Sequence, residues 1–272
     1  MYSSDLSDGQ WDLVESILFE YYLPMTGKIP KGGRRMKWVM RDIIDAILYV
    51  MKTGCQWRML PDDFPPWQSV YRHFRKLKRH GVWAKILEIV NRTVRQAAGR
   101  TAMPTLGIID AQAVKTIYCG PKRGFDGFKK IKGRKRNIVV DILGCLLAVT
   151  VESAGVHDTM LAGSLMQQAV AVYPSIEAFC GDSGYRGTAT QAAQKLGCKM
   201  IISAGVKSKK DSSKPFPILP KRWIVERSFG WFGHNRRLSK DYEKLPENSE
   251  TVCIISALRH GLNRLMYLNK TQ

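Results

Sequence analysis

The sequence predicts an α/β protein, with an all-helical region over residues 1–100 and a mixed sheet flanked by helices over residues 101–272. Two observations predict this division. Apolar residues recur at helical spacing through the first hundred residues, whereas short apolar runs of strand length alternate with helical segments after Thr101. The chain is also 44% hydrophobic and 10% aromatic, which is enough for a buried core and argues against global disorder.

The all-helical region is predicted to contain four helices. Ser7 and Gln10 form a capping-box pattern at the start of the first helix. The second helix is expected to end at Gly54 and the third at Gly81, because glycine commonly terminates helices. The fourth helix is expected over residues 83–94.

The third helix, which begins near Trp67 and ends at Gly81, carries a basic face opposite its apolar face. Its cationic and imidazole side chains, with no acid among them, are Arg72, His73, Arg75, Lys76, Lys78 and Arg79. Helix, connection and basic helix have the outline of a helix-turn-helix, although the 13-residue connection over residues 54–66 is long for one. The composition of this face favours contact with DNA, and a solvated cationic face on a core helix is the alternative.

The second region is predicted to begin with a strand over residues 105–110 and a β-hairpin over residues 137–151 that turns at Leu143 and Gly144. Further elements are expected as a helix over 158–171, a strand over 176–182, a helix over 188–196, a strand over 199–203 and a last helix over 250–266. A strand, a hairpin and then alternating helices and strands produce a mixed sheet covered by helices.

The charge of the chain narrows the choice of partner. Its 43 Lys and Arg residues against 23 Asp and Glu residues give a net charge of +20, which favours nucleic acid or an anionic membrane surface. The chain has no run of about 18 apolar residues that could span a membrane, and its N-terminus lacks the features of a secretory signal. We therefore expect a nucleic-acid partner, no membrane and a cytoplasmic location. The 6 cysteines stand singly and are expected to be reduced and structural, without zinc.

Three acidic residues, Asp110, Asp182 and Glu226, lie in or directly after short apolar runs. A carboxylate in such a place is costly unless a positive charge compensates it, and three of them suggest a shared pair of divalent metal ions. In-line cleavage of a phosphodiester needs an activated nucleophile and a stabilised leaving oxygen, which two ions about 4 Å apart supply. Mg²⁺ is the expected ion because it prefers oxygen ligands.

We expect Asp110 near the end of the first strand, Asp182 at the carboxyl end of a later strand and Glu226 on a helix that crosses the sheet. Each acid also has a structural alternative. Asp110 could be a turn residue at a strand end, and Asp182 could form an Asx-turn in Asp-Ser-Gly. Glu226 could simply pair with Arg222, four residues earlier on the same helix.

Other acids compete for the same role. They are Asp126, Asp141 and Asp158. Asp141 lies in the middle of the hairpin and is expected on a solvent face. Asp158 follows His157 in the pattern of a helix N-cap, and His157 itself could cap, pack in the core or touch substrate.

Several segments resemble bacterial insertion-sequence transposases, specifically the family whose prototype is insertion sequence five. The segments cover most of the chain, in both its helical and its sheet region. They are GCQWRMLPDDFPPWQSVYRHFRKLKRHGVW, IIDAQAVKT, KGRKRNIVVDILGCLLAV, GVHDT, GDSGYRG and IVERSFGWF followed by RRLSKDYE.

The resemblance implies an RNase H-like catalytic domain of the DDE type over residues 101–272 and a DNA-binding region over residues 1–100. It makes Asp110, Asp182 and Glu226 the three catalytic, metal-binding acids. It also implies two Mg²⁺ per active site, with Mn²⁺ as a substitute, and binding of the terminal inverted repeats of an element. Cleavage and strand transfer of double-stranded DNA, a homodimer or higher oligomer on DNA, and a bacterial cytoplasmic, nucleoid-associated location follow from the same resemblance.

Basic residues in both regions are expected to contact DNA. Members of the wider group often carry a basic residue about six positions after the third acid, but here that position is Phe232. The expected contacts are Arg72, Arg75, Lys76, Arg79, Lys115, Lys132, Arg134, Lys135, Arg136, Arg222, Arg227, Arg236 and Arg237.

The main alternative function is a catalytically silent, transposase-derived DNA-binding regulator, and the intact acid trio argues against it. A metal-dependent nuclease without a joining step is a further alternative. An RNA-binding module is disfavoured because the chain shows no aromatic-rich RNP pattern.

Overall fold

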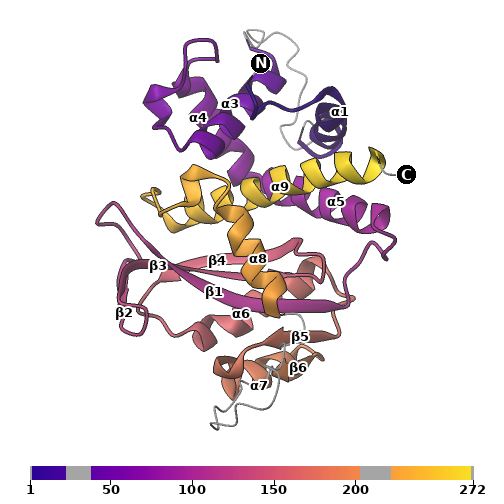
Figure 1. Ribbon diagram of the computed structural model, residues 1–272, viewed down its shortest axis with the longest axis vertical. Coiled ribbons are helices and arrows are strands. Elements are labelled where there is room, and N and C mark those ends of the chain that lie inside the picture. Colours follow the sequence, from indigo (N-terminus) through magenta and orange to yellow (C-terminus); the bar gives the residue numbers. More distant parts are fainter. Residues whose placement is uncertain (1, 23–37, 203–221, 271–272) are drawn as a thin grey trace, which may run out of the picture. The chain divides into compact units, whose positions relative to one another are not determined.

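The computed structural model describes residues 2–22, 38–202 and 222–270 (Figure 1). The chain divides into two compact units. The helical unit comprises Met1–Arg100, Phe232–Lys240 and Thr251–Gln272, and the sheet unit comprises Thr101–Trp231 and Asp241–Glu250. The division expected from the sequence placed every residue after 100 in one domain, whereas two C-terminal segments group with the N-terminal helices. The functional assignment of the two regions stays a prediction.

The described helices of the helical unit begin and end close to the predicted residues. They are α1 (Asp8–Ile17), the short π-helix η1 (Leu18–Tyr22), α3 (Met40–Thr53), η2 (Trp57–Met59), α4 (Trp67–Arg79), α5 (Val82–Ala97), η4 (Arg236–Leu238) and most of α9 (Pro246–Lys270). The predicted capping box is confirmed, because Ser7 and Gln10 exchange both side-chain-to-backbone hydrogen bonds, at 3.4 and 3.1 Å. Gly54 follows α3 in the left-handed conformation, with a φ of 71°, as the predicted helix end requires.

The sheet of the second unit is mixed. Its strands are β1 (Leu106–Lys115), β2 (Gly124–Asp126), β3 (Ile131–Val140), β4 (Leu146–Ser153), β5 (Ala178–Gly181) and β6 (Lys199–Ile202). They follow the order β2-β3-β1-β5-β6, and β4 pairs with β3. The β1–β3 and β3–β4 pairs are antiparallel, whereas β1–β5 and β5–β6 are parallel. The predicted hairpin is therefore confirmed as β3 and β4.

Helices α6 (Asp158–Val172) and α7 (Thr188–Lys195) bury their apolar residues against one face of this sheet, in a core with Ile109, Val139 and Phe179. Helix α8 (Arg222–Phe232) crosses the sheet, as Figure 1 shows. At one end of α8, Arg222 lies near Asp182 beyond β5. Farther along the helix, Ser228 Oγ donates to the carbonyl of Gly144 in the β3–β4 turn.

Two strands are longer than predicted. β1 continues five residues past Asp110 to Lys115, and β3 begins at Ile131, six residues before the start of the predicted hairpin. The two strands pair along this extension, where Lys115 lies opposite Gly133. A Cβ atom at Gly133 would clash with the carbonyl of Val114, so the close pairing depends on this glycine. The expectation that Asp110 lies near a strand end is therefore wrong: it lies in the middle of β1.

Candidate active site

Asp110 and Asp182 occupy equivalent places on neighbouring strands. β1 and β5 run parallel, with Ile108 paired to Cys180. Asp110 lies two residues beyond Ile108, and Asp182 lies two residues beyond Cys180, directly after the end of β5. The sheet thus places both carboxylates on the same side. Burial is the main cause that raises the pKa of Asp110, and the nearby charge of Asp182 adds to it.

The local structure fixes the direction of the Asp182 side chain. Its Oδ1 accepts a hydrogen bond of 2.8 Å from Gly184 N at the start of the short helix η3 (Ser183–Tyr185). A Cβ at residue 184 would lie 2.9 Å from that oxygen, which explains the glycine. The Asx-turn considered as an alternative is therefore present. It leaves Oδ2 directed at Arg222, so the structural role does not exclude a role in the site.

Asp110 is the most deeply placed of the three acids. Burial raises the pKa of this carboxyl group from its ordinary 3.8 to about 6. A 2.8 Å hydrogen bond from Ala111 N to Oδ1 and the charges of Arg222 and Lys129 act in the opposite direction. The carboxylate form of Asp110 is thus under-compensated by the positive charges around it.

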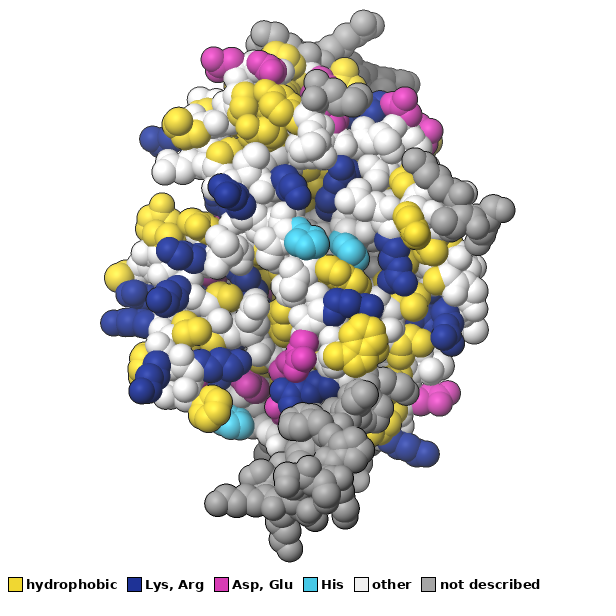
Figure 2. Space-filling view, in the orientation of Figure 1, with side chains coloured by type: hydrophobic (Ala, Val, Ile, Leu, Met, Phe, Trp, Pro, Cys, Tyr) yellow, Lys and Arg dark blue, Asp and Glu magenta, His cyan; other side chains and the backbone are white. Residues whose placement is uncertain are grey.

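Arg222 is the common neighbour of the three acids. Its Nη2 lies 3.8 Å from Asp182 Oδ2, its Nε lies 3.4 Å from Glu226 Oε1, and its charge lowers the pKa of Asp110. The pairing of Glu226 with Arg222, predicted as the alternative role of Glu226, is therefore present. The Glu226 side chain is 57% exposed, compared with 33% for Asp182. Figure 2 shows acidic side chains beside Lys and Arg on the lower part of this face.

The three acids have the donor chemistry of a divalent-cation site, but their side chains are not gathered into one. Carboxylate oxygens are the ligands that Mg²⁺ and Mn²⁺ prefer, and a buried carboxyl group with a raised pKa favours an added positive charge. Within the described ranges, no group of three or more His, Cys, Asp or Glu side chains is placed to hold a metal ion. Arg222 supplies the positive charge between Asp182 and Glu226 instead.

The competing acids have structural partners. Asp141 is fully buried, and its Oδ1 accepts hydrogen bonds from Leu143 N and Cys145 N in the β3–β4 turn, so the expectation of a solvent face is wrong. The backbone N–H groups of the turn explain the burial of Asp141, because its carboxylate accepts hydrogen bonds from two of them at once.

The remaining competing acids, Asp126 and Asp158, both pair with Lys135, at 3.5 and 2.9 Å. Asp158 is the first residue of α6, and the N-cap is His157, whose ring accepts from Thr159 N. The predicted cap is therefore one residue earlier than expected. The capping role considered for His157 is the one that the structure shows.

The residues predicted to contact DNA differ widely in exposure. Six are exposed: Arg72, Arg75, Arg79, Lys115, Lys132 and Arg236. Three are partly buried: Lys76, Arg222 and Arg227. Four are buried: Arg134, Lys135, Arg136 and Arg237. Burial gives these four a structural explanation, and we leave them out of the proposed DNA contacts below.

Arg134 illustrates how a charge from a basic segment becomes buried. It is 1% exposed and lies 3.0 Å from Asp241 Oδ2, whose side chain is 0% exposed. Its guanidinium also donates to the carbonyls of Pro121, Glu243 and Lys244. The pairing joins β3 to the segment that begins at Asp241, within the sheet unit.

The other buried cations also have partners inside their own units. Lys135 pairs with Asp126 and Asp158, as described above. Arg136 lies 3.5 Å from Gln112 Oε1 on β1. In the helical unit, Arg237 donates to the carbonyl of Cys55 at 3.0 Å. Arg134, Lys135, Arg136 and Arg237 are each 8% exposed or less, so their burial has a structural explanation within the fold.

Two residues gain a role that the sequence did not predict. Lys129 Nζ donates to the carbonyl of Ala111 at 3.2 Å and lowers the pKa of Asp110. Its position in a run of basic residues gave no signal that separated it from its neighbours. Arg227 stacks over the rings of Trp223 and Trp231, at 4.5 and 4.6 Å, which orients a cation that was predicted only as a DNA contact.

Comparisons with known proteins agree with this architecture. Residues 6–87 match the family described as a putative transposase of the IS4/5 family, and residues 101–259 match the family described as the transposase DDE domain. The chain is also 27% identical, over 121 residues, to the insertion element IS402 uncharacterized 16.2 kDa protein of Burkholderia cepacia. That alignment covers 44% of this chain and 78% of the relative.

The mixed sheet, its covering helices and the match to the DDE domain together define an RNase H-like fold, as predicted. The class is that of metal-dependent enzymes that act on DNA. The chain belongs to the transposases with a DDE domain, and within them it resembles the IS4/5 group, as the sequence predicted. Among the described residues, no helix has the length and apolar character needed to cross a membrane.

Proposed function

We propose that this transposase binds the terminal inverted repeats of an insertion sequence and carries out Mg²⁺-dependent strand cleavage and strand transfer into target DNA. One observation carries the proposal: Asp110 and Asp182 stand at equivalent positions of two neighbouring parallel strands, and Arg222 links them to Glu226. The match to the DDE domain supports the enzymatic part of the proposal.

In this proposal Asp110, Asp182 and Glu226 hold two Mg²⁺ ions, with Mn²⁺ as a substitute. Such ions activate the attacking group and stabilise the leaving oxygen of a phosphodiester. Asp182 is pre-oriented by its Asx-turn, and Asp110 is fixed in the middle of β1. Glu226 is the most exposed of the three and the freest to change its side-chain position.

The DNA contacts that we propose are the cations that remain accessible. On α4, Arg72, Arg75 and Arg79 are exposed and Lys76 is partly so, while the opposite face buries Val70, Phe74 and Leu77. In the sheet unit, Lys115 and Lys132 are exposed. Arg222, Arg227 and Arg236 complete the set.

Two further parts of the proposal follow from the reaction. Strand transfer of an element requires its two ends to be brought together, so we propose a homodimer or higher oligomer on DNA. The bacterial cytoplasm, in association with the nucleoid, is the proposed location because the substrate is chromosomal DNA.

The test is a cleavage assay on a plasmid that carries the element with its own flanking repeats. We expect nicking at the element ends with Mg²⁺, none with EDTA, and loss of cleavage but not of end binding in Asp182→Asn and Glu226→Gln. Asp62→Asn, which changes an exposed acid of the helical unit, is the matched control. Cleavage that survives both active-site changes would overturn the assignment.

The same assay separates the alternatives. A wild-type protein that binds the repeats without cutting them in Mg²⁺ would be a silent regulator. A protein that cuts but cannot join precleaved ends to a second plasmid would be a nuclease without a joining step.

A further inference from the structure

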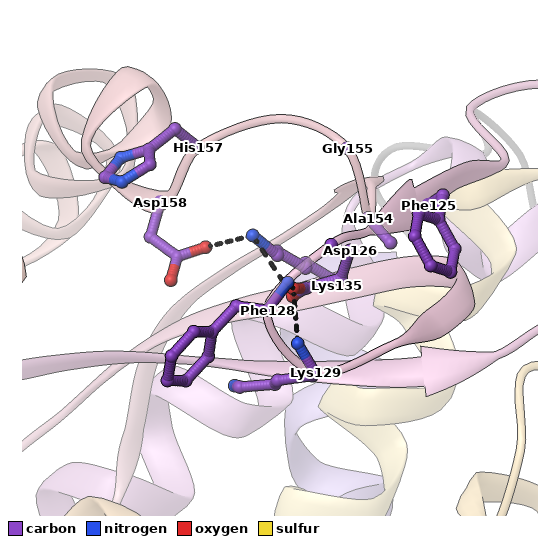
Figure 3. A pocket seen from close by; sticks show the side chains of 10 residues that line it. Phe125, Asp126, Phe128, Lys129, Lys135, Ala154, Gly155, His157 and Asp158 are labelled. Atoms are coloured by element: carbon purple, nitrogen blue, oxygen red, sulfur yellow. Dashed lines mark hydrogen bonds and ion pairs between the residues drawn. The ribbon is translucent and has the colours of Figure 1, made fainter.

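Strand β2 and the turn that joins it to β3 each present one aromatic ring to solvent. Phe125 is 57% exposed and Phe128 is 94% exposed. Together they line a pocket of about 310 Å³, shown in Figure 3, whose other walls come from the same turn, from the middle of β3, from the segment after β4 and from the beginning of α6. Exposed aromatic rings that border a pocket commonly mark a binding surface.

The turn that carries Phe128 is held in place by a buried carboxylate. Asp126 is 7% exposed, and its Oδ1 accepts hydrogen bonds from Phe128 N and Lys129 N at 3.0 and 2.9 Å. Its other oxygen pairs with Lys135, as the dashed lines in Figure 3 show. The exposure of Phe128 is thus built into a fixed turn, which lowers the entropy cost of binding against its ring.

The charges that line the pocket balance one another. Lys129 and Lys135 face two acids, Asp126 and Asp158, and Lys135 pairs with both. A lining without excess positive charge does not select a phosphate. Aromatic rings beside paired polar groups instead suit a flat, neutral, hydrogen-bonding group such as a nucleobase.

The surroundings of the pocket suit the rest of a nucleic-acid strand. Lys130 and Lys132, on the same turn and the following strand, are exposed. Lys129 links the pocket to the acid trio, because it lines the pocket while its Nζ donates to the carbonyl of Ala111, next to Asp110. A DNA strand bound beside Asp110 would therefore also reach this pocket, and its phosphates would lie beside the exposed Lys130 and Lys132.

We propose that the pocket binds an unpaired nucleobase of the DNA substrate, stacked on Phe128 and bordered by Phe125, beside the strand that is cut. The inference rests on the proposed function, because it takes DNA as the substrate and Asp110 as part of the site where the strand is cut. Because every base offers a flat face for stacking, the pocket accepts any unpaired base rather than one sequence.

The experiment compares a blunt duplex with the same duplex carrying a short single-stranded thymidine overhang, both labelled, by fluorescence anisotropy in EDTA so that no cleavage intervenes. Stacking of one base predicts that the wild type binds the overhang duplex about 5 to 150 times more tightly than the blunt one. The double variant Phe125→Ala/Phe128→Ala should lose this preference and keep its affinity for the blunt duplex. Phe128→Trp should keep both.

Phe19→Ala is the matched control, because Phe19 is a 70% exposed phenylalanine of the helical unit. It should leave the preference unchanged. A photoreactive 5-iododeoxyuridine in the overhang should cross-link to Phe128 or Phe125, mapped by mass spectrometry. Thermal unfolding of each variant verifies that these surface changes leave the fold intact.

The outcomes separate this inference from the proposed function. Binding of both duplexes without an overhang preference overturns the nucleobase pocket and leaves DNA as the substrate. Equal weakening of both duplexes by the double variant overturns it in favour of insertion into duplex DNA. A change of oligomeric state with an unchanged overhang preference overturns it in favour of contact with a second copy. Failure to bind either duplex overturns both proposals.

Discussion

Arg222 Nη2 lies 3.8 Å from Asp182 Oδ2, and the same guanidinium reaches Glu226 Oε1 through Nε at 3.4 Å. One arginine thus neutralises two of the three proposed metal ligands and lowers the pKa of the third, Asp110. A divalent cation would bind the same oxygens. Because the Arg222 guanidinium and the cation compete for one set of carboxylates, each lowers the affinity of these carboxylates for the other.

This competition predicts the behaviour of Arg222→Ala. The ion pairs are about one-third to one-half exposed, so their loss should cost about 1 kcal/mol or less and lower the Tm in EDTA by roughly 2–4 °C at most. Added Mn²⁺ should then raise the Tm of the variant more than that of the wild type. Differential scanning fluorimetry measures both effects.

Arg186→Ala is the control for this prediction, since Arg186 is an exposed arginine four residues after Asp182. It should respond to Mn²⁺ like the wild type. If Arg222→Ala gains no more from Mn²⁺ than Arg186→Ala, the guanidinium and the ion do not compete.

The buried position of Asp110 predicts a pH dependence of stability in EDTA. The pKa of Asp110 is about 6 in the folded state against an ordinary 3.8. Below about pH 4 both states hold the proton, so Asp110 has no effect. Between about pH 4 and 6 the unfolded chain loses the proton while the folded protein keeps it, so the unfolding free energy falls as the pH rises. Above about pH 6 the full cost remains, up to about 3 kcal/mol.

Asp110→Asn removes this ionisation and keeps the acceptor for Ala111 N. In EDTA the variant should therefore be more stable than the wild type near pH 7, and the advantage should shrink toward pH 4, as measured by urea unfolding. Asp45, whose pKa burial also raises to about 6, contributes equally to both proteins and cancels in the comparison. An advantage that stays constant from about pH 4 to pH 8 would contradict the assignment.

The buried pair of Arg134 and Asp241 predicts a large loss of stability for Asp241→Ala. The change leaves a guanidinium that is 1% exposed without its carboxylate, and such uncompensated charges cost about 3–5 kcal/mol. Lys132 lies on the same strand as Arg134 but is exposed, so Lys132→Ala should change the unfolding free energy by no more than about 0.5 kcal/mol. Urea unfolding that gives similar values for the two variants would show that Arg134 is not a structural residue.

The exposed face of α4 predicts the salt dependence of DNA binding. Each phosphate contact contributes about 0.9 to the slope of log affinity against log salt concentration. The triple variant Arg72→Ala/Arg75→Ala/Arg79→Ala should therefore bind duplex DNA less tightly and lower the magnitude of this slope by about 2 to 3. Arg100→Ala, an exposed arginine after α5, is the single-charge control. An unchanged slope in the triple variant would show that the basic face of α4 is solvated and makes no phosphate contacts.

Local sequence patterns were sufficient to predict most of the helices and the hairpin. The capping box of Ser7 and Gln10, the glycine after α3 and the alternation of the β3–β4 hairpin depend on neighbouring residues only. α9 began earlier than expected, at Pro246, because proline is favoured at the first turn of a helix and its signal was missed.

The extent of β1 and β3 could not be predicted, because it depends on partners far along the chain. Lys135 and Arg134 belong to a segment with the composition of a solvated loop. They are buried because Asp158 and Asp241 neutralise them, and these acids lie far away in sequence. The same long-range pairing places Asp110 in the middle of β1 rather than at its end.

The sequence neighbours of Asp110, Asp182 and Glu226 were enough to select these acids as candidate site residues. They were not enough to predict which side chains lie around the acids in the folded protein. The sequence placed Arg222 and Glu226 on one helix and predicted their pairing. The approach of Arg222 to Asp182 and the contact of Lys129 with the Ala111 carbonyl depend on how the turn and α8 meet the sheet. No local pattern encodes those contacts.

Isothermal titration of Mn²⁺ into the metal-free protein shows whether Asp110, Asp182 and Glu226 hold metal ions together. We expect Asp110→Asn, Asp182→Asn and Glu226→Gln each to lower the Mn²⁺ affinity by at least about tenfold, whereas Asp62→Asn leaves it unchanged. Wild-type affinity and stoichiometry in any one of the three active-site variants would contradict the claim that these acids form a single metal site.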